Sequence, residues 1–145
     1  MSPLRTMLLP AALLLALLTG CASPPQPTAD LLAPTEEQMK VRSYQSRTFD
    51  IGERARVLRG VIAALQDLGF IIERANEPLG LVTAARFAEP DYYSVIEVTV
   101  TVRSVGEGRI SIRANAIFNN EPVTDPETYR NFFATLERAL FIARS

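Results

Sequence analysis

The most regular pattern of hydrophobic and polar residues in the chain is an alternation between Tyr93 and Arg103. Successive side chains of a strand point to opposite faces of a sheet, so this alternation predicts a strand with one buried and one wet face. A similar run begins after a turn at residues 104–108. We expect the two runs to form an antiparallel hairpin that pairs residue 103 with residue 109, because this register places Val102 opposite Ile110 on the apolar face.

Three shorter runs predict further strands. Residues 41–49 alternate weakly and are expected to form the first strand, with one wet face. Residues 70–74 and 81–87 are largely apolar, and the segment between them contains Pro78 and Gly80, which favour a turn. These two runs are therefore expected to form a second hairpin.

Two segments carry apolar side chains at the spacing of an amphipathic helix. The first follows Asp50, which stands three residues before Glu53 as in a capping box, and it ends at Gly69, where a Schellman motif is expected. In the second, Asp125 is the predicted cap and Pro126 the first helical residue. The apolar stripe of this second helix consists of Tyr129, Phe132, Phe133, Leu136, Leu140 and Ala143, and is widened by Phe141 and Ile142.

The predicted order of elements is β-α-β-β-β-β-α, which indicates an α+β fold. An antiparallel sheet with one apolar face needs cover, and the two amphipathic helices can provide it. The expected architecture is a curved antiparallel sheet packed by two helices, of the helix-grip or TBP-like type. The alternative is a ferredoxin-like fold with an extra hairpin.

Near the N-terminus, the tetrapeptide Leu-Thr-Gly-Cys at residues 18–21 is typical of the lipobox that ends a bacterial lipoprotein signal peptide. Arg5 precedes an apolar stretch that runs from Met7 to Leu18. The alternative, a transmembrane helix, is disfavoured because about 12 apolar residues are too few for a span that needs about 20. Residues 1–20 are therefore predicted to be a signal peptide, and the mature protein is expected to begin at Cys21.

The thiol and the amine of Cys21 are the expected sites of acylation, which gives this residue a covalent N-acyl diacylglycerol group. No other cofactor is expected. Several acyl chains hold a protein stably on a bilayer, so the lipid anchor predicts a permanent membrane association. Ala22 and Ser23 follow, and neither is the aspartate that signals inner-membrane retention in enteric bacteria. The predicted location is the outer membrane, with the protein facing the periplasm.

The domain organisation follows from the composition along the chain. Residues 21–38 are rich in proline and polar residues, and this segment is predicted to be a flexible tether behind the lipidated cysteine. Residues 39–145 are expected to form a single α+β domain, which is long enough for one hydrophobic core. Glu36 to Val41 could instead form a short helix that leads into this domain.

Charge and residue usage exclude several classes of function. The chain has 15 basic and 16 acidic residues, and this balance does not indicate a nucleic-acid partner. It contains no histidine, and its one cysteine is the predicted lipidation site. The commonest metal ligand, the usual general base and a free thiol nucleophile are therefore missing. We expect no catalytic residue and no metal site.

Two groups of residues are candidates for binding a protein partner. Arg42, Gln45 and Arg47 occupy polar positions of the first predicted strand. They could bind an acidic partner segment or the carboxylates of peptidoglycan, or simply form a wet sheet face. Tyr92 and Tyr93 precede the central strand and could form an exposed aromatic contact, or pack at the edge of the core.

Three segments of the mature chain read RxxQxRxFD at residues 42–50, LQDLGF at residues 65–70 and LG at residues 79–80. Together they resemble a family of uncharacterised proteobacterial lipoproteins. This resemblance implies no catalytic residue, since the family brings no known one. The layout is also similar, more distantly, to that of BamC-type outer-membrane lipoprotein domains, which are accessory to β-barrel assembly.

The sequence thus leads to two hypotheses of function. The first is a non-enzymatic outer-membrane lipoprotein whose domain docks on another envelope protein. The second is a carrier of a lipid or another apolar ligand, with a cavity between sheet and helices. Phe118, Phe132, Phe133 and Leu136 are bulky enough to fill that space, which favours docking. The oligomeric state and the identity of the partner are not predicted.

Overall fold

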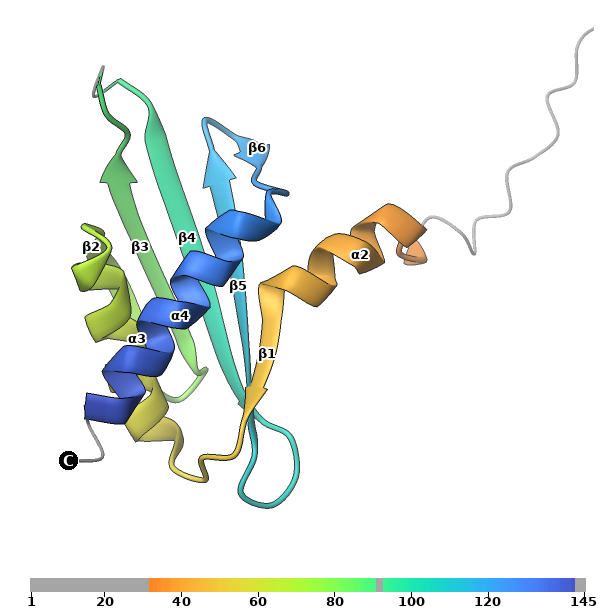
Figure 1. Ribbon diagram of the computed structural model, residues 1–145, viewed down its shortest axis with the longest axis vertical. Helices are drawn as coiled ribbons and strands as arrows, with labels where there is room; N and C mark the ends of the chain where they lie inside the picture. The colour runs from red at the N-terminus through yellow and green to blue at the C-terminus, as the bar shows by residue number, and fades with distance from the viewer. Residues whose placement is uncertain (1–31, 91–92, 143–145) are drawn as a thin grey trace, which may run out of the picture. The chain divides into compact units, whose positions relative to one another are not determined.

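The computed structural model describes residues 32–90 and 93–142, which fold into an open antiparallel sheet of six strands with three helices (Figure 1). The helices are α2 (Glu36–Gln45), α3 (Arg54–Asp67) and α4 (Pro126–Ile142). The strands are β1 (Ser46–Phe49), β2 (Ile71–Asn76), β3 (Leu81–Phe87), β4 (Val95–Ser104), β5 (Ile110–Phe118) and β6 (Glu121–Pro122).

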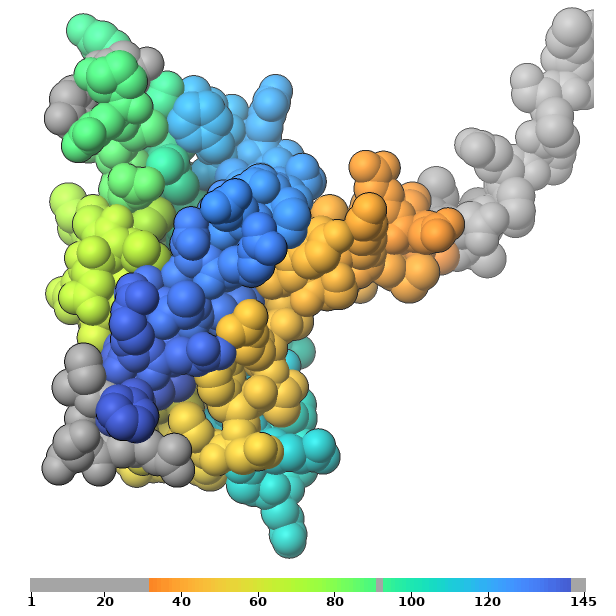
Figure 2. Space-filling view, viewed as in Figure 1, coloured from red at the N-terminus to blue at the C-terminus, as the bar shows by residue number. Residues whose placement is uncertain are grey.

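The strands lie in the order β1-β5-β4-β3-β2, and β6 pairs with β5 as well. The helices α3 and α4 lie across the same face of this sheet, the face that Figure 1 shows. In the space-filling view, α4 closes over this face and α2 projects beyond β1 (Figure 2). The predicted fold class, an α+β antiparallel sheet packed by two helices, is confirmed.

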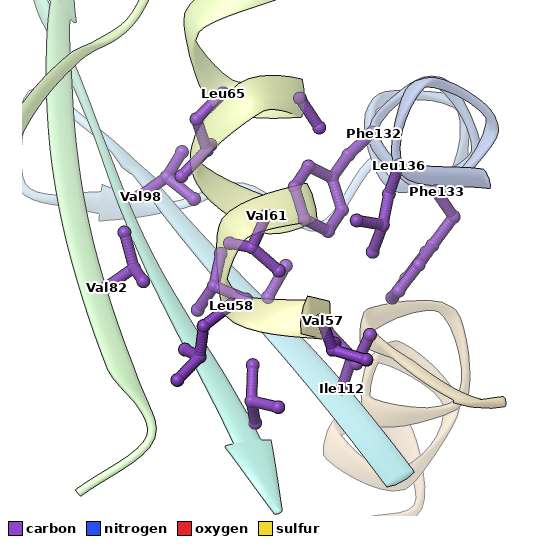
Figure 3. Close-up of a cluster of buried hydrophobic side chains, with 14 of the residues drawn as sticks. Val57, Leu58, Val61, Leu65, Val82, Val98, Ile112, Phe132, Phe133 and Leu136 are labelled. Atoms are coloured by element: carbon purple, nitrogen blue, oxygen red, sulfur yellow. The ribbon is translucent and has the colours of Figure 1, made fainter. Parts of the chain in front are cut away.

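The core lies between the sheet and these two helices. Valines and isoleucines at alternate positions of β4 and β5 point toward α3 and α4, as strand geometry requires. Side chains from both helices fill the space above them (Figure 3). The fully buried large side chains include Val57, Val61 and Leu65 of α3, Tyr129, Phe133 and Leu136 of α4, and Val82, Val100, Val102, Ile110 and Ile112 of the sheet.

Two aromatic residues that were expected in the interior lie outside it. Phe118 stands at the end of β5 and is 42% exposed. Phe141 follows the buried Leu140 on α4 and is 70% exposed, because one residue along a helix turns the side chain by about 100°. The apolar stripe of α4 is therefore narrower than the sequence suggested.

The first predicted strand is wrong over most of its length, since residues 36–45 form the helix α2 and only residues 46–49 form a strand. A capping box starts this helix: the Gln38 N–H donates to Thr35 Oγ1 over 3.2 Å, and the Thr35 N–H donates to Gln38 Oε1 over 3.0 Å. These local bonds outweigh the weak alternation. Residue 38, where the predicted tether ends, therefore lies within a helix.

Of the two predictions for the ends of α3, the one for its start is wrong and the one for its end is confirmed. Asp50 does not cap this helix, because Glu53 occupies the N-cap position and its side chain makes no capping hydrogen bond. The expected Schellman motif is confirmed at the other end. There Gly69 has φ +80°, its N–H donates to the Gln66 carbonyl, and the Phe70 N–H donates to the Leu65 carbonyl, both over 2.9 Å.

The register of the β4–β5 hairpin differs by two residues from the prediction. Val102 lies opposite Ile112, and not opposite Ile110. A shift of two residues keeps every side chain on its face, so the hydrophobic pattern could not distinguish the two registers. The turn decides between them: Gly106 and Gly108 both have positive φ and allow a shorter loop, closed by the Val105 N–H on the Arg109 carbonyl.

Candidate functional site

The open face of the sheet is the side turned away from α3 and α4, and neither of these helices covers it. Its members alternate with the buried residues along each strand, and the strand register aligns them in rows. It is rich in hydroxyl side chains and arginines. Its residues are Ser46, Thr48, Ile71, Arg74, Asn76, Leu81, Thr83, Ala85, Phe87, Val95, Glu97, Thr99, Thr101, Arg103, Ser111, Arg113, Asn115 and Ile117.

One end of the open face holds a hollow of about 360 Å³, which we call the cationic hollow. Its lining contains two arginines, hydroxyl and amide side chains, and no carboxylate. It is formed by Ser46, Thr101, Arg103, Val105, Ser111, Arg113 and Asn115. Three strands and one loop thus bring together residues that are far apart in the sequence.

Arg113 is the most enclosed cation of this hollow. Its Nη2 donates to Gln45 Oε1 over 3.4 Å, a long hydrogen bond. Its Nε is buried and has no hydrogen-bond partner in the described part of the chain. Within residues 32–90 and 93–142, neither Arg103 nor Arg113 forms a salt bridge with a carboxylate. Both positive charges of the hollow are therefore uncompensated by direct ion pairs.

Gln45 belongs to a buried polar network behind Arg113. Only 7% exposed, it donates from Nε2 to Tyr129 Oη over 3.1 Å. Tyr129 Oη also accepts from the Ala116 N–H over 3.3 Å and donates to the Val123 carbonyl over 2.6 Å. The predicted position of Gln45 on a wet strand surface is wrong. Its side chain instead supports Tyr129, whose Oη satisfies the Ala116 N–H of β5 between the pairings of β5 with β1 and β6.

The two arginines that were grouped with Gln45 lie in different environments. Arg47 of β1 contacts α4: its Nη1 lies 2.6 Å from Glu137 Oε1, and its guanidinium lies 4.8 Å from the centre of the Phe133 ring. Arg42 is exposed on α2 and makes no hydrogen bond or ion pair with the described residues. Arg42, Gln45 and Arg47 therefore do not form one binding surface.

The remaining candidate residues are the aromatic pair Tyr92 and Tyr93 and the predicted lipidation site Cys21. Tyr93 is 92% exposed just before β4, as an aromatic contact would require. Tyr92 and Cys21 lie outside the described residues. No helix in the described ranges is long and apolar enough to span a membrane. These same ranges contain no cluster of side chains suited to hold a metal ion.

The other end of the open face holds a second hollow, of about 240 Å³, which the sequence analysis missed. We call it the apolar hollow; Ile71 and Phe87 in its lining are 71% and 59% exposed. The rest of the lining is Glu73, Ala85, Arg86 and Val95. The sequence contains a signal for this hollow. Phe87 continues the outward-facing positions of the run that begins at residue 81, so its alternation predicts an exposed aromatic side chain.

A third hollow, of about 530 Å³, is a groove between α3 and α4. Its lining includes the charged residues Glu53, Arg56 and Arg59 and the small residues Gly60 and Ala63. Arg56 crosses toward α4, where its Nη2 donates to the Leu140 carbonyl over 3.1 Å. Charged side chains and small apolar residues thus share the lining of this groove.

Comparison with known proteins adds no relative. No protein-family model matches the chain, and no curated protein is significantly similar to it. The resemblance to a lipoprotein family therefore stays a prediction.

Proposed function

We propose that this protein is a non-enzymatic lipoprotein of the outer membrane, held by the lipid on Cys21, whose periplasmic domain docks on another envelope protein through the open face of its sheet. The observation that carries this proposal is the composition of that face. It places the exposed Ile71 and Phe87 at one end and two arginines without ion pairs at the other. Exposed apolar side chains beside polar and charged ones are typical of protein-binding surfaces.

The edges of the sheet are less suited to bind a partner than its open face. The edge strand β2 has an irregular register around Glu73, and both Glu73 and Arg74 are exposed on it. At the opposite edge, β1 has only four residues. Bulges, charges and short strands all discourage the addition of a foreign strand. These features favour a face-on partner over β-strand addition.

The filled core supports docking over the carrier hypothesis. Tyr129, Phe133 and Leu136 are at most 1% exposed and belong to the hydrophobic core. Figure 3 shows Phe133 and Leu136 in the space between α4 and the sheet. A carrier of this architecture would need that space for its ligand. The three hollows described above lie outside the core and are lined in part by charged side chains.

A lipid anchor makes a small docking surface sufficient. Two proteins on the same membrane meet at a high effective concentration, so the contact between their domains does not need high affinity. We therefore expect the isolated domain to bind its partner weakly in solution, and the anchored protein to bind it specifically in the cell.

The proposal is tested by site-specific photo-crosslinking of the full-length protein in its own cells. A photoreactive residue at Glu97, exposed at the centre of the open face, should give one dominant adduct with an envelope protein. The matched control is the same residue at Ala63, which is exposed on α3 at the other side of the domain. Equal adducts from both positions, or none from Glu97, would contradict docking through the open face.

A further inference from the structure

We infer that the cationic hollow binds the carboxylates of an acidic segment of the partner protein, and that a large apolar side chain of the same segment enters the apolar hollow. This inference rests on the proposed docking function and specifies the chemistry of the partner. It follows from charge, from the support behind Arg113, and from the positions of the two hollows.

The charge of the cationic hollow is complementary to that of a carboxylate. The cationic hollow combines the guanidinium groups of Arg103 and Arg113 with hydroxyl donors such as Ser111, and its lining has no acidic side chain. A guanidinium offers a planar set of N–H donors that matches a carboxylate, and such charge-assisted hydrogen bonds are stronger than neutral ones. A carboxylate is therefore the protein group that best fits this lining.

Arg113 is held in place from behind and still has unused donors. The bond to Gln45 occupies its Nη2, and the Gln45 side chain is itself fixed by Tyr129. The Nε of Arg113 is buried and out of reach of a partner, whereas its Nη1 makes no hydrogen bond with the described residues and remains available. A partner that supplies oxygen atoms would meet a guanidinium whose position is already restricted, which lowers the entropic cost of binding.

The positions of the two hollows define the length of the partner segment. Val95 lines the apolar hollow and Thr101 the cationic hollow, and both belong to the open face of β4. Six residues of a strand span about 20 Å, since each residue advances by about 3.3 Å. An extended segment with an apolar residue about six positions from its acidic residues would reach both hollows at once.

An anionic bilayer fits this surface less well than an acidic peptide does. Recognition of anionic lipids by charge alone uses clusters of about four to eight basic residues. The open face carries Arg74, Arg103 and Arg113, with Arg86 beside the apolar hollow, but these basic residues are spread along the sheet, and the exposed carboxylate of Glu97 lies between the two hollows. That carboxylate would be repelled by a uniformly negative membrane.

The test uses the photoreactive residue at Glu97 in the full-length protein and reverses the charge of the hollow. The double variant Arg103→Glu/Arg113→Glu should reduce the adduct about tenfold or more, as expected for lost charge pairs in an interface. The matched control, Lys40→Glu/Arg42→Glu, makes the same change in net charge on the exposed face of α2 and should leave the adduct unchanged.

A second variant distinguishes loss of binding from loss of the fold. Ser111→Glu places a carboxylate in the cationic hollow and retains both arginines, and it should also reduce the adduct about tenfold. The thermal unfolding midpoint of each purified variant is measured to confirm that the domain is intact. Once the crosslinked segment of the partner is mapped, replacing its acidic residues by lysine should restore the adduct with the double arginine variant.

The outcomes separate this inference from the proposed function. An adduct that survives charge reversal at folded Arg103 and Arg113 overturns the inference and leaves docking through the open face intact. Absence of any adduct from Glu97 overturns both. Arginine-dependent sedimentation of the lipid-free mature chain with phosphatidylglycerol vesicles, without an arginine-dependent protein adduct, would overturn the inference in favour of a membrane surface.

Discussion

Gly80 illustrates how a single residue joins two hairpins of the sheet. It ends the turn between β2 and β3 with φ +65°, a conformation that favours glycine. Its carbonyl accepts a hydrogen bond of 2.7 Å from the Val102 N–H of β4. A Cβ atom added to Gly80 would collide with the backbone oxygen of Val102. The Leu-Gly pair in the family-like pattern therefore has a physical reason.

The substitution Gly80→Ala should lower the free energy of unfolding by about 2–3 kcal/mol, because the left-handed strain and the backbone collision add. The matched control is Gly69→Ala. Gly69 has φ +80° with nothing within 4 Å of an added Cβ, so this change should cost only about 1 kcal/mol of strain. Urea unfolding of the lipid-free mature chain measures both values, and equal losses would contradict the role of the close approach to β4.

Two of the described helices, α2 and α4, begin at a side-chain cap. At the start of α4, Asp125 Oδ2 accepts hydrogen bonds of 2.9 Å from both the backbone N–H and the hydroxyl of Thr128. The backbone bond, followed by the hydroxyl bond, lowers the pKa of the Asp125 carboxyl below its ordinary value of 3.8. The carboxylate is thus favoured in the folded state, and its negative charge also suits a helix N-terminus.

This capping bond predicts a pH dependence of stability. Because the pKa of Asp125 is lower in the folded than in the unfolded state, its contribution is present above 3.8 and is lost as the pH falls through the folded-state value. Asp125→Asn keeps an oxygen acceptor but cannot titrate. The thermal midpoint of the wild type should therefore fall relative to that of the variant as the solution is acidified below pH 3.8. A difference that stays constant with pH, followed by circular dichroism, would refute this assignment.

At the level of the complete protein, membrane location and recognition of the partner are proposed to depend on different parts of the chain. The acyl chains on Cys21 are expected to hold the protein on the membrane, and the open face is expected to choose the partner. Both functions are needed if the contact between domains is weak. Cys21 precedes the residues that the structure describes, so the two proposed roles can be tested separately.

The substitution Cys21→Ser should move the protein from the membrane pellet to the soluble periplasmic fraction, because no acyl chain can be attached. The matched control, Ser23→Ala, should leave it in the pellet. Cell fractionation with immunoblotting makes the measurement, and crosslinking at Glu97 in the soluble variant should be weaker at equal expression. Retention of the serine variant in the pellet would contradict anchoring through Cys21.

Local patterns accounted for much of the fold. The alternation along β4 identified its buried face, Gly69 identified the end of α3, and Asp125 identified the start of α4. Each of these depends on interactions between residues close in sequence, so short segments contain the necessary information. The α+β class follows, because amphipathic helices and a one-sided sheet have few ways to bury their apolar faces together.

Contacts between distant segments decided the rest. The register of the β4–β5 hairpin is a local exception: a shift of two residues preserves the hydrophobic pattern, and the closed loop after β4 selects the pairing of Val102 with Ile112. Gln45 and Tyr129 are 84 residues apart, and no local signal marks the buried bond between them. The cationic hollow likewise exists only where Ser46, Arg103 and Arg113 meet in three paired strands. The sequence contains these arginines, but their common surface comes from the free energy of packing the whole sheet, to which every distant contact contributes.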